Sequence, residues 1–201
     1  MKPDPGVRRS KDAEESARAE ARREERDLVA RARGGDAEAF RALVERHRDR
    51  AYGLALRIVR VPAEAEEVAQ DAFVRVWRAL PAFRGESSFG TWLHRIVARR
   101  AIDRAALLRG RRGREAELDD VAEPGGVGPP RDLESALRAR RLERLMGRLT
   151  EVQRAVVTLY YWEDRSVEDV AIRLGLPPNT VKTHLSRARA LLRGAWMEEE
   201  S

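Results

Sequence analysis

Apolar residues recur at helical spacing along most of the 201-residue chain, and no segment alternates between apolar and polar positions as a half-buried strand does. Changes in this spacing, together with Gly, Pro and capping residues, mark where each helix begins and ends. Helices are expected over residues 27–33, 36–61, 63–80, 89–112, 133–147 and 150–164, with two more within 166–193. The pattern therefore predicts an all-α fold.

The segment from Ser166 to Arg193 has the pattern of two helices joined by a tight turn. Ser166 can cap the first helix, Gly175 can adopt the left-handed conformation that ends it, and Pro178 suits the first turn of the second. The outer face of the second helix carries polar side chains that can reach base edges and phosphates in a major groove: Asn179, Lys182, Thr183, Ser186 and Arg187. We predict a helix-turn-helix that binds DNA, with a solvated helical hairpin as the alternative.

Composition divides the chain into two ordered parts. Residues 1–26 mix charges without an apolar stripe, which predicts a disordered tail or, alternatively, an arm that touches DNA. Residues 115–132 are acidic and rich in Gly and Pro, which is typical of a flexible linker. We expect two small helical domains, 27–114 and 133–196, of which the second is a four-helix, winged-helix-like domain containing the helix-turn-helix.

The chain has a formal net charge of +6 and a pI near 10.4, which suits a polyanionic partner, although a membrane surface or solubility alone would fit equally well. There is no cysteine, so disulfides and thiol chemistry are excluded. The three histidines lie far apart, and we expect no catalytic residue, metal, cofactor or small-molecule substrate. No apolar run approaches the ~20 residues that span a bilayer, and no secretion signal is present. We therefore expect a cytoplasmic protein without membrane insertion.

Two helices of the first domain carry opposite charges. The helix over 63–80 has acidic and polar side chains close together on adjacent turns: Glu64, Glu67, Gln70 and Asp71. This patch is either a solvated face or a docking site for a basic partner, and composition leaves both open. The helix from Phe89 is the most basic segment, with Arg95, Arg99, Arg100, Arg104, Arg109, Arg111, Arg112 and Arg114. Arginines beside the aromatic residues Phe83, Phe89 and Trp92 fit single-stranded nucleic acid, although core packing is the alternative for each ring.

Four stretches together resemble the extracytoplasmic-function (ECF) sigma factors of bacterial RNA polymerase, which keep only sigma regions 2 and 4. The stretches are AEEVAQDAF at 65–73, FRGESSFGTWLHRI at 83–96, LTEVQRAVVTLYYWED at 149–164 and TVKTHLSRAR at 180–189. The resemblance covers residues 27–196. It implies a sigma factor, without enzymatic activity, that gives core polymerase its promoter specificity, recognises the −35 and −10 elements and melts the −10 region.

The resemblance also implies which residues act. The helix over 63–80 would dock on the clamp of the polymerase β′ subunit through Glu64, Glu67, Gln70, Asp71 and Phe73. The −10 element would be melted, and one base captured, by Phe83, Arg84, Ser87, Ser88, Trp92, Arg95, Arg99, Arg100 and Arg104. The −35 element would be read by Asn179, Thr180, Lys182, Thr183, Ser186 and Arg187, while region 4 also contacts the β flap. An anti-sigma factor is implied as the partner that holds the free protein inactive.

The chain departs from the family pattern at several DNA-facing positions. Asn179 replaces the usual Gly, and Arg99 stands where many members have Asn. Thr183 and His184 replace Ser-Arg. The promoter sequence therefore cannot be transferred from relatives. The residues also leave room for a dimeric helix-turn-helix regulator that binds operators without polymerase, and for an all-α adaptor that binds RNA or protein.

Overall fold

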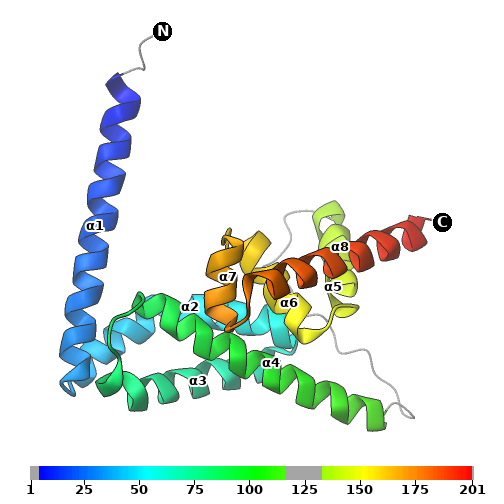
Figure 1. Cartoon of the computed structure of the whole chain (residues 1–201), viewed down its shortest axis with the longest axis horizontal. Coiled ribbons are helices and arrows are strands. Elements are labelled where there is room, and N and C mark those ends of the chain that lie inside the picture. Colours follow the sequence, from blue (N-terminus) through cyan, green and yellow to red (C-terminus); the bar gives the residue numbers. More distant parts are fainter. Residues whose placement is uncertain (1–4, 116–132, 201) are drawn as a thin grey trace.

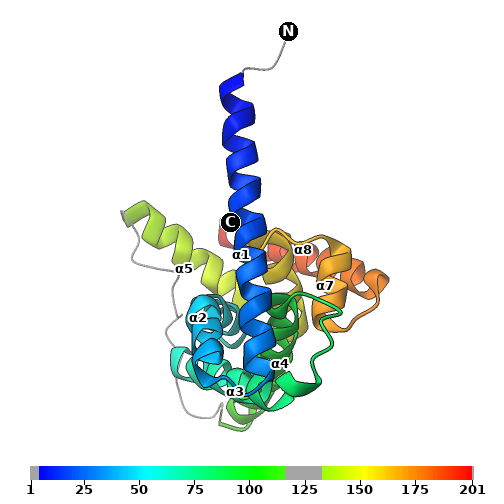
Figure 2. The same ribbon diagram turned by 90° about the vertical axis from the view of Figure 1, so that its left-hand side faces the viewer.

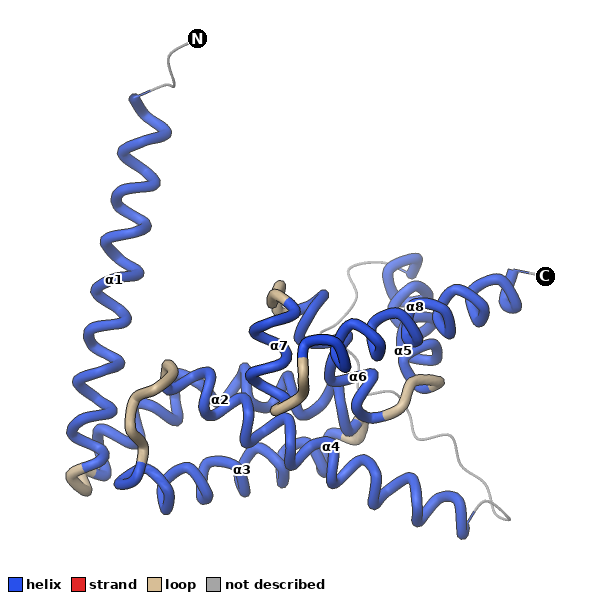
Figure 3. The backbone as a smooth tube through the Cα atoms, in the orientation of Figure 1, coloured by secondary structure: helices blue, strands red, loops and turns tan. Residues whose placement is uncertain are grey.

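The computed structural model of the protein describes residues 5–115 and 133–200, which fold into helices joined by turns and loops (Figures 1 and 3). The helices are α1 (Pro5–Arg33), α2 (Ala37–Val59), α3 (Pro62–Ala79), η1 (Leu80–Ala82), α4 (Phe89–Glu115), α5 (Leu133–Gly147), α6 (Glu151–Val157), η2 (Thr158–Trp162), α7 (Val167–Leu174) and α8 (Pro178–Glu200). Neither range contains a strand, and the predicted all-α class is confirmed. The predicted linker at 115–132 lies outside the described residues, apart from its first residue.

The N-terminal bundle consists of α2, α3 and α4, each of which packs against the other two. Asp36 caps α2, because its carboxylate accepts hydrogen bonds of 3.0 Å from the N–H groups of Glu38 and Ala39. The largest fully buried side chains of the bundle are aliphatic: Leu43, Leu54, Ile58, Val76, Leu80, Leu93 and Val97. This packing brings the acidic face of α3 next to the basic face of α4.

The N-terminus differs from the prediction. The sequence predicts a disordered tail over residues 1–26, whereas a single helix, α1, runs from Pro5 to Arg33 (Figures 1 and 2). Near its C-terminal end α1 packs on α2, where Glu24 lies 3.0 Å from Arg46 and Glu25 lies 3.3 Å from the buried His47. These contacts join residues more than 20 positions apart, so they leave no local signal in the sequence. The other end of α1 extends away from the bundle.

The C-terminal bundle consists of α5, α6, η2, α7 and α8. A capping box opens α6: the Gln153 N–H donates to Thr150 Oγ1 at 3.3 Å, and the Thr150 N–H donates to Gln153 Oε1 at 2.9 Å. The helix predicted over 150–164 begins as an α-helix and ends as a π-helix. In its last turn the Glu163 N–H donates to the Thr158 carbonyl, five residues back, at 3.2 Å. This π-helical turn, η2, widens the end of the helix before α7 begins.

The two bundles are packed against each other. α7 contacts α4, and α6 contacts both α2 and α4. The apolar cluster of the N-terminal bundle continues into the C-terminal bundle through Ala155, Val156, Leu159, Val170, Ala171, Val181 and Leu185. Two ion pairs also cross the contact, Arg60 to Glu143 at 3.5 Å and Arg109 to Glu151 at 2.8 Å. We call this arrangement of the two bundles the closed state.

Candidate DNA and polymerase interfaces

The helix-turn-helix is formed by α7 and α8, as predicted (Figure 1). Ser166 caps α7 by accepting a hydrogen bond of 3.0 Å from the Asp169 N–H. Gly175 ends α7 with a φ of 66°, in the left-handed region where a side chain would be strained. The Leu176 N–H then donates to the Ala171 carbonyl at 3.0 Å and closes the turn. These local bonds set the direction in which α8 leaves the turn.

The two faces of α8 differ in exposure. The apolar face is buried: Val181, Leu185 and Ala188. The face predicted to read the −35 element is exposed, except for a half-buried Thr180: Asn179, Lys182, Thr183, Ser186 and Arg187. The buried face fixes the rotation of the helix, so the exposed face presents a defined set of polar groups.

The polar groups of α8 are not equally available. The Thr183 hydroxyl donates to the Asn179 carbonyl at 2.9 Å, so its donor is used within the helix. Among the residues that the structure describes, neither Lys182 nor Arg187 has a hydrogen-bond or ion-pair partner. These two cations are therefore free to bind an acidic ligand such as DNA.

A pocket of about 460 Å³ lies where the loop before α4 meets the end of α3, a size typical of sites for small ligands. The rings of Phe83 and Trp92 stack in its wall, with centroids 4.5 Å apart and planes inclined by 20°. Arg84 and Ser87 add polar groups to the lining. Phe89, in contrast, is 2% exposed and belongs to the core, as its alternative reading predicts. The pocket thus offers an aromatic wall and polar donors to a flat ligand.

The residues predicted for the −10 element have different surroundings. Arg84 and Arg99 are exposed and, within the described ranges, have no polar partner. Arg95 instead donates from Nε and Nη2 to the Ile172 carbonyl, at 3.0 and 2.8 Å. Ser88 caps α4, since its Oγ accepts from the Thr91 N–H at 3.1 Å. Ser88 therefore has a structural role in the closed state, whereas Arg84 and Arg99 are open to DNA.

Arg100 and Arg104 bind the acidic face of α3. Arg100 Nε lies 2.7 Å from Asp71 Oδ2. Arg104 donates to the carboxylate of Glu64 and lies 2.9 Å from Glu67. The structure thus joins two sets that the resemblance keeps apart, the β′-docking residues and two arginines of the −10 set. The two arginines are four residues apart, and the carboxylates are three or four apart, so each set lies on one face of its helix. This spacing is the signal from which the packing of the two helices could have been inferred.

The pairing changes the character of the acidic face. Burial alone would raise the pKa of Asp71, but hydrogen bonds from Arg75 and Arg100 outweigh burial and hold the pKa of Asp71 below its ordinary value. Glu67 remains the most exposed carboxylate of the set, with 68% of its side chain accessible, and Gln70 is also exposed. Phe73 is 9% exposed and packs in the core, so it supports the face from beneath.

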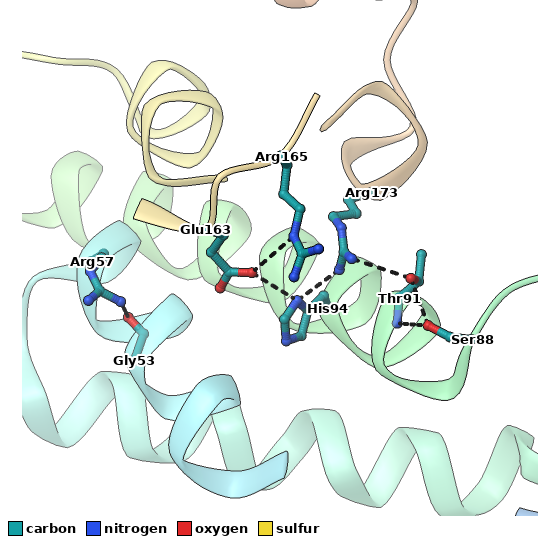
Figure 4. A network of polar contacts seen from close by, with 8 residues as sticks. All are labelled: Gly53, Arg57, Ser88, Thr91, His94, Glu163, Arg165 and Arg173. Atoms are coloured by element: carbon teal, nitrogen blue, oxygen red, sulfur yellow. Dashed lines mark hydrogen bonds and ion pairs between the residues drawn. The ribbon is translucent and has the colours of Figure 1, made fainter. Parts of the chain in front are cut away.

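A polar network between the bundles was not anticipated from the sequence (Figure 4). Arg173 of α7 donates from Nη1 to His94 Nδ1 at 2.8 Å, and from Nη2 to Thr91 Oγ1 at 3.3 Å. Glu163 Oε2 lies 3.4 Å from the same His94 nitrogen. Burial, followed by the positive charge of Arg173, lowers the pKa of His94 to about 3, so the ring is neutral. An arginine in a short helix usually faces solvent, and nothing local marks Arg173 as buried.

The described ranges hold neither a cluster of metal ligands nor a membrane-spanning helix. Within residues 5–115 and 133–200, no three His, Asp or Glu side chains converge in the way that a metal site requires. None of the helices in those ranges combines the length and the apolar character needed to cross a bilayer.

Comparison with known proteins identifies the two bundles separately. Residues 43–112 match the family model of sigma-70 region 2, and residues 139–192 match that of sigma-70 region 4. Among solved structures, CnrH in complex with the cytosolic domain of CnrY is 28% identical, with a TM-score of 0.62, and the match covers 89% of this chain and 99% of that one. RpoE of Bartonella quintana, in complex with the anti-sigma factor NepR, shares the fold with a TM-score of 0.61 at 22% identity over 80% of this chain and 98% of that one.

Whole-chain relatives agree with these matches. The RNA polymerase sigma-H factor of Pseudomonas aeruginosa is 35% identical, and the match covers 83% of this chain and 90% of the relative. The ECF RNA polymerase sigma-E factor of Haemophilus influenzae is 34% identical over 82% of this chain and 91% of the relative. Both regions are present in order, and the relatives match over more than four fifths of the chain, so the chain belongs to the extracytoplasmic-function sigma factors of bacterial RNA polymerase.

Proposed function

We propose that this sigma factor gives core RNA polymerase its promoter specificity through three surfaces, one on each of α3, α4 and α8. The observation that carries the proposal is the orientation of α8, whose apolar face is buried while Lys182 and Arg187 project without partners among the described residues. A fixed helix with free cations on one side suits a major groove. The test is run-off transcription from a genomic library, in which core polymerase with this protein should start at promoters that core polymerase alone ignores.

The −35 surface yields a prediction for single substitutions. Lys182→Ala or Arg187→Ala should weaken promoter binding by the holoenzyme by about 1–3 kcal/mol if the side chain reads a base. If the side chain touches only phosphate, binding should fall by the same factor on all sequences and the salt slope should shrink by about one. Gel shifts at two salt concentrations, on a promoter and on a version with a scrambled −35 element, separate these cases. Unchanged binding by both variants would exclude α8 as the reading helix.

The −10 surface is proposed to hold an unstacked base against Phe83 and Trp92, with Arg84 and Arg99 on the backbone of the strand. The support for this role is the pocket, whose aromatic wall can replace the stacking that a flipped base loses. The structure leaves Arg100 and Arg104 bound to α3, so any contact of theirs with DNA requires that they leave those carboxylates.

Phe83→Leu keeps an apolar side chain but removes the flat ring. Because stacking of one base on an aromatic ring is worth about 1–3 kcal/mol, open-complex formation should fall by roughly 5- to 150-fold. The measurement is permanganate reactivity of unpaired thymines in the −10 region. Tyr52→Leu, which removes a partly exposed ring from α2, is the matched control and should leave melting unchanged. Equal melting by both variants would contradict the pocket assignment.

Polymerase binding is proposed to use the exposed part of the α3 face, centred on Glu67 and Gln70, together with a contact of the C-terminal bundle with the β flap. By analogy with the solved relatives, whose structures are complexes, an anti-sigma factor is the proposed inhibitor. The chain itself would bind and deform DNA without any catalytic step. Its place of action would be the cytoplasm, where the polymerase transcribes.

A further inference from the structure

Arg173 is buried where the two bundles touch. It belongs to the helix-turn-helix, yet it is 7% exposed and its guanidinium contacts His94 and Thr91 of the other bundle (Figure 4). Burial of an arginine is costly unless its donors are satisfied. Here His94 Nδ1 and Thr91 Oγ1 accept from Nη1 and Nη2, while the buried Nε has no hydrogen-bond partner among the described residues. The contact is therefore specific to the closed state, since separation of the bundles would return Arg173 to water.

The same contact reaches the −10 pocket. Ile172 of α7 forms part of the pocket lining, next to Phe83 and Trp92. Its carbonyl belongs to the last turn of α7, where carbonyl groups lack partners within the helix and attract cations. Arg95 is the cation that binds this carbonyl, through two hydrogen bonds. A DNA strand approaching the pocket would thus meet α7 beside it, and would find Arg95 already engaged.

The closed state is also too compact to span a promoter. The −35 and −10 elements lie about 25 base pairs apart, which is roughly 85 Å along B-DNA at ~3.4 Å per base pair. In the closed state α7, which positions the reading helix α8, is in direct contact with α4, which borders the −10 pocket. The two surfaces cannot occupy their elements together until the bundles separate.

We propose that the closed state is an autoinhibited form, in which α7 covers one side of the −10 pocket and the contact of Arg173 with His94 and Thr91 holds it there. The inference rests on the proposed function, because it takes the pocket beside Phe83 as the −10 site. It adds that the chain restrains itself, through its own helix-turn-helix and without a second protein. Binding to core polymerase would then have to separate the bundles before promoter DNA can enter.

Spin labels can report the separation directly, because the chain has no cysteine of its own. One label is attached at Glu45→Cys on α2 and the other at Glu168→Cys on α7, both exposed positions. The parent protein should give one short, narrow distance distribution. Arg173→Ala and His94→Arg should each shift it to longer and broader distances. His94→Arg alters the N-terminal bundle and Arg173→Ala alters the C-terminal bundle. Misfolding of one bundle therefore cannot explain longer distances in both variants.

Affinity for DNA is measured on the same proteins, as anisotropy of a fluorescein-labelled single-stranded DNA of mixed sequence. If one molecule in ten of the parent is open, full opening should raise the affinity about tenfold. Arg173→Ala removes a positive charge while His94→Arg adds one, so a gain shared by both cannot arise from charge. Arg140→Ala, on the exposed side of α5, is the matched loss of charge and should not open the chain.

Two results would overturn the proposal: long, broad distances in the parent protein, or opened variants that bind DNA no more tightly than the parent. The spin-label distances test whether the bundles are packed together, and this result does not depend on what the pocket binds. The effect of Phe83→Leu on promoter melting tests the pocket, and this result does not depend on whether the free protein is closed. Failure of the autoinhibition and failure of the proposed −10 site are therefore distinguishable.

Discussion

Replacement of Glu67 and Asp71 by arginine is expected to abolish binding of the protein to the β′ clamp. Both carboxylates lie on the α3 face proposed to meet a basic partner, and like charges placed across an interface cost several kcal/mol. A loss of about 3 kcal/mol or more corresponds to an affinity at least ~100-fold lower. The measurement is a pull-down of the isolated β′ clamp, followed by titration with full core polymerase. Normal capture of the clamp by the double variant would exclude this face as the docking site.

The closed state supplies the control that this experiment needs. Reversal of Glu67 and Asp71 also breaks their contacts with Arg100 and Arg104 inside the protein. Arg100→Gln with Arg104→Gln breaks the same internal pairs but leaves both carboxylates on α3. If docking depends on the carboxylates, this second variant should still bind the clamp. Loss of binding in both variants, with reduced thermal stability, would instead indicate that the pairs hold α3 and α4 in place.

Acidification is expected to open the free protein. His94 has a pKa of about 3 in the closed state and would return towards the ordinary value of 6.5 once the bundles separate. A proton therefore binds the open state more tightly. The closed state keeps its full stability above pH 6.5 and loses about 1.4 kcal/mol for each unit as the pH falls towards 3. At pH 5.0 the loss is about 2 kcal/mol, or roughly a 30-fold shift towards the open state.

Burial of the His94 ring, followed by the charged groups around it, explains why its pKa is lowered. Arg173 and Arg165 of the C-terminal bundle, with His47 and Arg50 of α2, disfavour a positive ring. Glu163, 3.4 Å from Nδ1, would favour it, but burial and the nearby positive charges dominate. The label distances at Glu45 and Glu168, compared between pH 7.5 and 5.0, measure the effect.

His94→Gln supplies the control for the acid experiment, because glutamine does not titrate. Its distances should not change between the two pH values, and near-ultraviolet circular dichroism confirms that the bundles stay folded. Equal acid sensitivity of the parent and His94→Gln would assign the effect to another group.

Local features of the fold could be predicted because each depends on a few neighbouring residues. The Ser166 cap, the left-handed Gly175 and the capping box of Thr150 with Gln153 all satisfy backbone groups within five positions. The family resemblance rests on similarly short stretches, and the comparisons confirm it. Sequence patterns of this kind specify helices and their ends, together with the side of each helix that faces the core.

Features that join distant segments could not be predicted in the same way. Glu25 of α1 reaches His47, and Arg173 of α7 reaches His94, across 22 and 79 positions. In the sequence, Arg173 and Glu25 look like ordinary solvated charges, and only the packing of helices buries Arg173 and half-buries Glu25. For the same reason the sequence predicts a tail where α1 lies, and it gives no sign of the contact between Arg104 and Glu64.

The two bundles that form the closed contact belong to one chain. They therefore meet at an effective concentration of the order of millimolar. An interface too weak to be detected between separate fragments can therefore be the resting arrangement of the whole chain, while remaining easy for a large partner to displace. The length of the connection matters little, since doubling it costs only about 0.6 kcal/mol. Silencing by closure should thus tolerate insertions between residues 115 and 133, yet respond to a single change at Arg173.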